Sequence, residues 1–166
     1  MASNNSDAPR PVLIALGANI PSAAGSPAKT LRAALRALEQ ADLEPIGVSP
    51  IYETEAWPDP GDPPFLNAVA AFKTRLQPFA LLTLLHEVET RFGRKRSLAN
   101  VPRSLDLDLL DYDGRVEEGA VMLPHPRLVE RRFVLEPLAV VAPGWRHPVS
   151  GMTVEAMLKA LYGRIS

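Results

Sequence analysis

Residues 102–110 read Pro-Arg-Ser-Leu-Asp-Leu-Asp-Leu-Leu, and the rest of the chain is interpreted from this stretch. The alternation predicts a β-strand that turns its leucines to one face, and Asp106 and Asp108 to the other. Like charges side by side on a strand are unfavourable unless a cation lies between them. The pair therefore indicates a site for a hard cation such as Mg²⁺, which binds oxygen ligands.

Basic residues are concentrated just before this strand. Positions 91–103 contain no acid and include Arg91, Arg94, Lys95, Arg96 and Arg103, although the whole chain has a formal net charge of -1. A run of charge is most often a solvated loop. Arginine predominates here, however, and its planar fork suits phosphate oxygens better than lysine does. Carboxylates beside clustered arginines favour a magnesium-complexed polyphosphate as ligand.

Length and composition are those of a globular protein. With 166 residues, 46% hydrophobic and 22% charged, we expect one domain over residues 11–166 after a disordered tail at residues 1–10. The near-zero net charge predicts neither nucleic acid nor membrane as a partner. The chain has no cysteine, which excludes disulfides and thiolate catalysis and is compatible with the cytoplasmic location that we expect.

Apolar periodicity predicts an α+β fold. The order is strand, helix, strand, strand, helix, strand, over residues 12–16, 26–38, 43–52, 65–75, 78–93 and 104–110. This is the order of a ferredoxin-like βαββαβ core, with a kink in the second strand at Gly47 or Pro50. We expect a C-terminal hairpin turning at Asp113-Gly114, and further helices over residues 127–141 and 153–162, packed on the sheet.

Two further groups have both a structural and a functional interpretation. Trp57, Phe65, Asn67 and Phe133 suggest a pocket for a flat ligand, although core packing is the simpler interpretation for Phe133. Asn67 is the informative member because asparagine is rare in strands and its amide can bond to a heterocycle edge. His125 lies between two prolines, either bonded to backbone or donating to a phosphate oxygen.

Several motifs occur together in one order. They are Ala15-Leu16-Gly17-Ala18-Asn19, Ser49-Pro50-Ile51-Tyr52-Glu53-Thr54, Phe65-Leu66-Asn67-Ala68, Glu89 with Gly93-Arg94, residues 102–108, Leu123-Pro124-His125-Pro126, and Arg131-Arg132-Phe133-Val134-Leu135. In these motifs, from Val12 to about Leu161, the chain resembles the 6-hydroxymethyl-7,8-dihydropterin pyrophosphokinases of the folate pathway. The resemblance implies transfer of pyrophosphate from ATP to the pterin hydroxymethyl group, with release of AMP. It also implies two Mg²⁺ ions, and we expect a monomer.

The resemblance assigns the site residues by position. Asp106 and Asp108 would hold the two Mg²⁺ ions, and Asp106 would assist removal of the hydroxyl proton. The triphosphate would be contacted by Arg94, Arg96, Arg103 and His125, and the nucleoside by Glu89 and Leu109. The pterin site would be lined by Thr54, Phe65, Asn67, Arg131 and Phe133, with the two phenylalanines on either side of the ring. Arg94 and Arg103 would act in catalysis with the two aspartates.

The chain departs from the family pattern at four places. Asn100 stands where many relatives have an aromatic residue, and Met122 where a hydroxyl residue is common. Glu55 and the loop over residues 57–64 differ from the usual proline- and glycine-containing version.

Three other functions fit parts of the pattern. An RNA-recognition module shares the order of elements, but it would need a basic sheet face rather than paired aspartates. A palm-type nucleotidyl transferase or cyclase also sets paired aspartates on such a sheet, and it would release pyrophosphate instead of AMP. A catalytically dead pterin- or nucleotide-binding relative is the third alternative, which retention of the aspartates and arginines disfavours.

Overall fold

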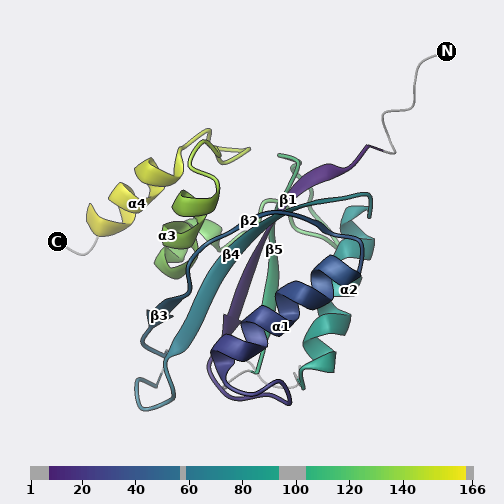
Figure 1. The fold of residues 1–166 in the computed structure, drawn as a ribbon. Helices are drawn as coiled ribbons and strands as arrows, with labels where there is room; N and C mark the ends of the chain where they lie inside the picture. The colour runs from purple at the N-terminus through teal and green to yellow at the C-terminus, as the bar shows by residue number, and fades with distance from the viewer. Residues whose placement is uncertain (1–7, 57–58, 94–103, 164–166) are drawn as a thin grey trace.

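An antiparallel five-stranded sheet forms the centre of the molecule (Figure 1). A computed structural model describes residues 8–56, 59–93 and 104–163. The strands are β1 (Arg10–Ala18), β2 (Glu44–Val48), β3 (Tyr52–Thr54), β4 (Phe65–Thr74) and β5 (Asp106–Tyr112). Their order is β2-β4-β1-β5, and β3 pairs with the same edge of β4 as β2. Sheet and helices together confirm the predicted α+β class.

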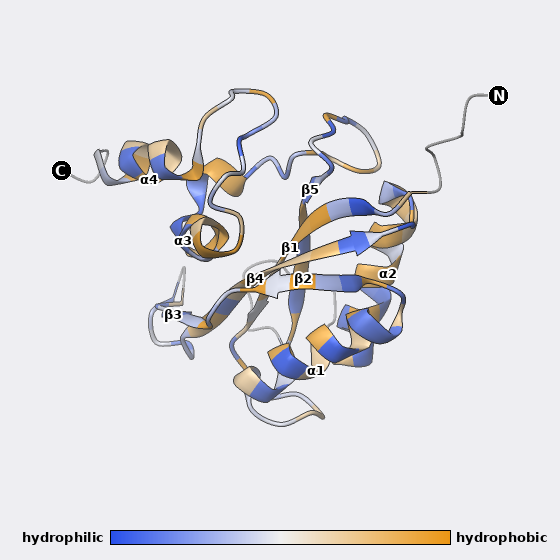
Figure 2. Ribbon diagram, turned by 45° about the horizontal axis from the view of Figure 1, so that its top comes forward, coloured by the Kyte–Doolittle hydropathy of each residue, from blue (hydrophilic) through white to orange (hydrophobic). Residues whose placement is uncertain are grey.

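Two helices cover one face of the sheet, α1 (Pro27–Gln40) and α2 (Pro78–Arg91) (Figure 1). Ser26 caps α1, because its hydroxyl accepts from the backbone N–H of Lys29 at 3.4 Å. The helices pack on alternate residues of the strands, among them Ile14, Leu16, Phe72 and Leu107. Figure 2 shows that both helices carry hydrophobic and hydrophilic bands, as expected for helices packed on a sheet.

A second core lies on the opposite face. It is formed by a 3₁₀ turn (Leu128–Glu130), α3 (Arg132–Val141) and α4 (Val154–Gly163). α3 packs on β4 and β3, while α4 packs on α3. The sheet contributes Leu13, Ala15, Val69, Ala71 and Leu110 to this core. The expectation that helices after residue 127 pack on the sheet is therefore confirmed for α3, whereas α4 packs mainly on α3.

The faces of β5 are those predicted from its alternation. Leu107 and Leu109, like the preceding Leu105, belong to the core under α1 and α2. Asp106 and Asp108 are partly exposed and lie on the opposite face. A bulge at Leu110 shifts the register between β1 and β5, so that Asp111 pairs with Leu13.

The predicted second strand is interrupted at Ser49, Pro50 and Ile51, which separate β2 from β3. Ser49 bridges the break: its N–H donates to the carbonyl of Val69 at 2.9 Å, and its Oγ accepts from the N–H of Val69 at 3.0 Å. A side chain thus replaces a backbone partner where proline prevents regular pairing. The kink is confirmed at Pro50, and a register shift between Pro45 and Gly47 adds a second irregularity.

The expected helix over residues 127–141 is two pieces. A 3₁₀ turn ends at Arg131, whose backbone is extended (φ -110°, ψ 95°), and α3 begins at Arg132. The segment is therefore mostly helical, as predicted, and is divided at Arg131. The break turns the side chain of Arg131 toward Asp108 on β5.

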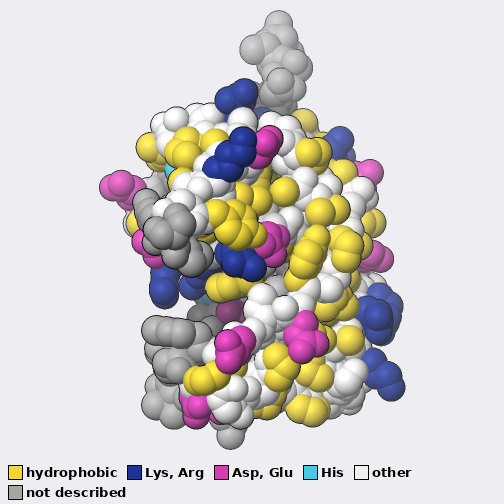
Figure 3. Space-filling model, turned by 90° about the vertical axis from the view of Figure 1, so that its left-hand side faces the viewer, with side chains coloured by type: hydrophobic (Ala, Val, Ile, Leu, Met, Phe, Trp, Pro, Cys, Tyr) yellow, Lys and Arg dark blue, Asp and Glu magenta, His cyan; other side chains and the backbone are white. Residues whose placement is uncertain are grey.

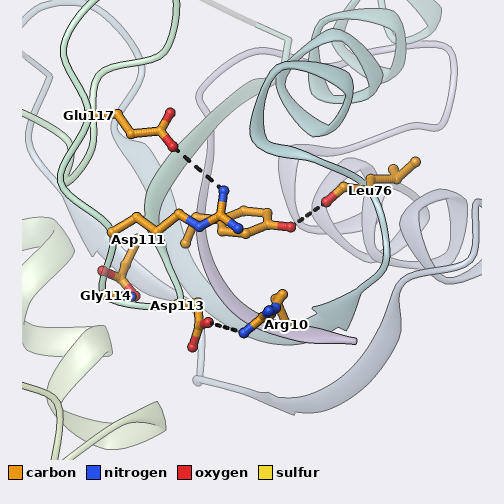
Figure 4. Close-up of polar contacts among 8 residues, drawn as sticks. Arg10, Leu76, Asp111, Asp113, Gly114 and Glu117 are labelled. Carbon is orange, nitrogen blue, oxygen red and sulfur yellow. Dashed lines mark hydrogen bonds and ion pairs between the residues drawn. The ribbon is translucent and has the colours of Figure 1, made fainter. Parts of the chain in front are cut away.

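After β5 the chain reverses at Asp113-Gly114 as predicted, but no second hairpin strand follows among the described residues. Glu117 and Leu123 form an isolated bridge instead. Figure 4 shows this end of β5, where Arg10 and Asp113 form an ion pair of 3.0 Å.

The first strand, β1, begins at Arg10, one residue before the expected start of the domain at residue 11. Residues 1–7 lie outside the described chain.

β2 forms an exposed edge of the sheet. Every residue of β2 is exposed, and Ile46 and Val48 leave about half of their surface uncovered (54% and 53%). From the side of β3, α3 and α4, hydrophobic side chains are interspersed with charged ones (Figure 3).

Within the described ranges, every helix is too short or too polar to cross a bilayer.

Candidate active site

The two aspartates of β5 mark the candidate site. Asp106 lies opposite Gly17 of β1, and Asp108 lies opposite Ala15. Directly opposed residues share a face, so both carboxylates stand on the α3 side of the sheet. They flank Leu107, whose side chain points into the opposite core.

Asp108 is contacted by one guanidinium and one imidazole. Arg131 donates from Nη1 to Oδ2 at 3.3 Å, and Nε2 of His125 lies 3.8 Å from Oδ1. Each carboxylate oxygen therefore faces a different side chain. These two contacts fix the direction of the part-buried Asp108 carboxylate within the site.

The position of His125 is fixed by its backbone and its ring. Its N–H donates to the carbonyl of Leu110 at 2.9 Å, and Nδ1 accepts from the N–H of Arg127 at 3.2 Å. The ring proton therefore lies on Nε2, toward Asp108. Burial lowers the pKa of His125, partly offset by the Asp108 charge. Neutral His125 is a single hydrogen-bond donor at this site.

Arg131 connects two parts of the site. Its guanidinium bonds to Asp108, and its Cζ lies 5.7 Å from the centroid of the Phe133 ring. Phe133 leaves 38% of its surface exposed in the first turn of α3, so the expected alternative of a core role does not account for it. An exposed aromatic face beside a guanidinium can stack a flat ligand.

Thr54, Phe65 and Asn67 lie close together on β3 and β4. Thr54 pairs with Phe65 across β3 and β4, and the Asn67 Nδ2 donates to the Thr54 hydroxyl at 2.9 Å. A cavity of about 390 Å³ opens beside Thr54, lined by Glu53, Thr54, Glu55, Ala56, Pro60, Asp62 and Pro64. The structure thus brings three of the predicted pterin-site residues together.

Residues 13–143 match the family described as 7,8-dihydro-6-hydroxymethylpterin-pyrophosphokinase (HPPK). The chain belongs to the HPPK family. Enzymes of this family transfer pyrophosphate to hydroxymethyldihydropterin in folate biosynthesis.

Named relatives cover most of the chain. The 2-amino-4-hydroxy-6-hydroxymethyldihydropteridine pyrophosphokinase of Bacillus subtilis is 41% identical over 130 residues, 77% of this chain and 75% of that protein. The folic acid synthesis protein fol1 of Schizosaccharomyces pombe is 34% identical over 150 residues, 89% of this chain but only 20% of the longer protein. The chain therefore spans about a fifth of fol1.

A solved relative has the same fold. Wild-type HPPK-DHPS of Plasmodium falciparum superposes with a TM-score of 0.71 at 14% identity, over 95% of this chain and 42% of that one. At this identity the similarity concerns the fold alone. The antiparallel sheet and its helices are thus the architecture of HPPK structures.

Two residues expected on the nucleoside side are buried. Glu89 of α2 is fully buried, and its Oε2 accepts from the N–H of Leu107 at 2.9 Å. Leu109 lies in the core under α1 and α2. The carboxylate of Glu89 thus binds the backbone N–H of Leu107, which lies between the two aspartates. That Glu89 and Leu109 contact the nucleoside stays a prediction.

Several expected site residues lie outside the described residues. They are Trp57 and, within residues 94–103, Arg94, Lys95, Arg96, Asn100 and Arg103. The described part of the chain therefore contains the carboxylates, His125 and the pterin-site residues. The departure at Met122 is described and exposed, and its sulfur accepts a hydrogen bond from the N–H of Gly119 at 3.5 Å.

Sequence reasoning missed two residues beside the site. Gly17 lies between Asp106 and Asn67 on β1, and Asn19 donates from Nδ2 to the carbonyl of Pro63 at 3.0 Å. Both belong to the motif Ala15-Leu16-Gly17-Ala18-Asn19, within which the sequence assigns neither residue a role. The signal available was a polar Asn19 and a glycine directly after an apolar run.

The carboxylate pair fits a divalent cation. Both aspartates supply hard oxygen ligands on one face of the sheet. A cluster of three or more histidine, cysteine, aspartate or glutamate residues is absent from the described residues. Two protein carboxylates with further ligands from phosphate and water are typical of Mg²⁺.

Proposed function

We propose that this protein catalyses the family reaction, transfer of pyrophosphate from ATP to 6-hydroxymethyl-7,8-dihydropterin with release of AMP. The observation that carries the proposal is the placement of Asp106 and Asp108 on the same sheet face as Asn67, Phe65 and Arg131. A charged site and a flat-ligand site therefore share one surface, which a reaction between a polyphosphate and a heterocycle requires.

Asp106 and Asp108 would hold two Mg²⁺ ions. The bound ions would neutralise phosphate charge and polarise the phosphoryl oxygens. Arg131 and His125 would donate to phosphate oxygens near Asp108, since both already point toward it. Group transfer of this type depends mainly on alignment and charge neutralisation by residues that are already in place.

The pterin ring would lie between Phe65 and Phe133, with its edge bonded to Asn67. Thr54 fixes the Asn67 amide by accepting from Nδ2, so that Oδ1 is available to a donor on the ring. Asp106 would accept the hydroxyl proton of the substrate. Arg94, Arg96 and Arg103 would contact the triphosphate, as the family resemblance implies.

Three finer statements belong to the same proposal. We interpret β2 and β3 as one interrupted strand, which makes the sheet order that of a ferredoxin-like βαββαβ core. We propose that the protein acts as a monomer, which light scattering would test. We also place the reaction in the cytoplasm, in keeping with a sequence without cysteine.

The test is a product analysis. Purified protein is incubated with MgATP and 6-hydroxymethyl-7,8-dihydropterin, and the nucleotides are separated by chromatography. The proposal predicts AMP only when pterin is present. Pterin-independent release of pyrophosphate would favour the palm-type transferase, and binding of both ligands without AMP would favour a non-catalytic relative.

A further inference from the structure

A row of residues crosses three strands between the two halves of the site. Gly17 of β1 pairs with Asp106 of β5 on one side and with Asn67 of β4 on the other. Directly paired residues share a face, so Gly17 separates a metal-ligand carboxylate from the pterin-site amide. Strand spacing puts the Cα atoms of Asp106 and Asn67 about 10 Å apart.

The backbone does not explain a glycine at this position. Gly17 lies inside β1 and is outside the left-handed region that favours glycine. A glycine in a strand interior is destabilising by roughly 0.5–1 kcal/mol relative to alanine. The presence of glycine at position 17 therefore needs an explanation other than backbone conformation.

Neighbouring atoms supply the reason. A Cβ on Gly17 would lie 3.1 Å from Oδ1 of Asn67 and 4.0 Å from Cδ1 of Phe65. A methyl group would therefore fill the space between the amide and the aromatic ring. With glycine, the floor of the site at this point is bare backbone.

The oxygen of the Asn67 amide faces this space. Asn67 donates from Nδ2 to Thr54, which turns Oδ1 toward Gly17. Within the described chain, Oδ1 accepts no hydrogen bond from another side chain. A planar ring with an N–H donor at its edge can bond to Oδ1 only if it lies close to the sheet at Gly17.

We propose that Gly17 is a specificity-determining residue of the substrate site. Its missing side chain lets a planar bicyclic heterocycle lie close to the sheet, with a donor edge at Asn67 and its reactive substituent directed along the row toward Asp106. This inference rests on the proposed function and adds the reason for a glycine between the two subsites.

Gly17→Ala tests the inference, with Gly47→Ala as the matched control. Gly47 is also a strand glycine outside the left-handed region, and a Cβ there would meet nothing within 4 Å. Binding of 6-hydroxymethylpterin and of a non-hydrolysable ATP analogue with Mg²⁺ is measured by calorimetry on the full chain. We expect Gly17→Ala to weaken pterin binding at least tenfold and to change nucleotide binding less than twofold. Gly47→Ala should change neither.

The outcomes separate the inference from the proposed function. A wild-type chain that does not bind pterin would overturn both. Wild-type binding with equal binding by folded Gly17→Ala would overturn the inference alone. A loss of nucleotide binding equal to the loss of pterin binding would also contradict it, since it would indicate general damage to the site.

A second measurement uses the wild-type chain and does not depend on the variant folding. In NMR spectra of the pterin complex, we expect nuclear Overhauser effects between the Gly17 Hα protons and the ligand. Their absence, while the Asn67 side-chain amide shifts on binding, would place the ring away from Gly17 and overturn the inference.

Discussion

At the scale of single residues, the chemistry depends on Asp108 and the groups around it. Its two oxygens face Arg131 and His125, at 3.3 Å and 3.8 Å. These contacts hold the carboxylate toward the site rather than toward solvent. Substitution at Asp108 should therefore affect catalysis much more than folding.

Asp108→Asn should lower turnover by on the order of 10²–10³-fold, as for the loss of a preorganised charge at a reacting centre. The free energy of unfolding should change by no more than about 1 kcal/mol, because the side chain is only part-buried. Steady-state kinetics and urea unfolding measure the two effects.

Asp113→Asn is the control for Asp108→Asn. Asp113 also lies at an end of β5 and forms one ion pair, with Arg10, but at the far end from the site. Its turnover should stay within twofold of wild type. Near-normal turnover in Asp108→Asn would contradict the metal-ligand assignment.

Arg131→Gln should affect both subsites, since Arg131 bonds to Asp108 and lies beside Phe133. We expect a lower kcat together with a higher KM for pterin, each by about tenfold, the size of one charge-assisted hydrogen bond. Arg132→Gln, which loses an exposed ion pair with Glu136 and a contact with the Tyr162 ring, should change neither. An effect of Arg131→Gln on only one of the two constants would count against a shared role.

At the scale of elements, the break between β2 and β3 positions the pterin site. Ser49 spans this break by bonding to Val69, and the chain then continues into β3, where Thr54 meets Asn67. The position of Thr54 therefore depends on the Ser49 bridge.

Ser49→Ala should destabilise the protein by about 1–3 kcal/mol, because the N–H of Val69 would lose its partner in a buried place. Ser150→Ala removes a hydroxyl that also accepts from a backbone N–H, but at an exposed place, and should change stability by less than about 0.5 kcal/mol. Urea unfolding compares the two. Equal effects would show that burial of the bridge does not matter.

Sequence patterns predicted the elements whose signal is local. The alternation in residues 105–109 predicted β5 and its two faces because strand periodicity depends only on neighbouring residues. The break at Arg131 and the hydrogen bond from Leu107 to Glu89 were not predictable in this way. Both depend on partners at least 18 residues away, which are brought close only by the fold. The same holds for Gly17, whose meaning depends on Asn67 and Phe65 of β4.

At the scale of the whole molecule, Asp111 connects β5 with the C-terminal segment. Its Oδ2 accepts from the N–H of Gly114 at 3.2 Å, and the nearby side chain of Trp145 favours the charged form of the carboxyl. Oδ1 is buried and has no hydrogen-bond partner within the described residues. Burial raises the pKa of Asp111 despite these two favourable groups, so the charged form is disfavoured in the folded protein.

Asp111 should therefore make stability depend on pH. A carboxyl whose pKa is higher in the folded state binds protons more readily when folded, so its contribution to stability grows as pH falls through the folded pKa. The amide in Asp111→Asn cannot titrate. The stability of this variant minus that of wild type should therefore be larger at pH 7 than at pH 4. A difference that does not change between these pH values, measured by urea unfolding, would contradict the raised pKa.

The central claim is that the aspartate site and the pterin site, on one face of the sheet, act together to transfer an intact pyrophosphate group. ATP labelled with ³²P at the β-phosphorus tests it directly, with pterin, Mg²⁺ and the wild-type chain. The account predicts that the label moves into a pterin diphosphate, in step with the AMP formed. Label in free pyrophosphate would indicate a nucleotidyl transferase, and label in ADP a simple kinase, and either result would contradict the account.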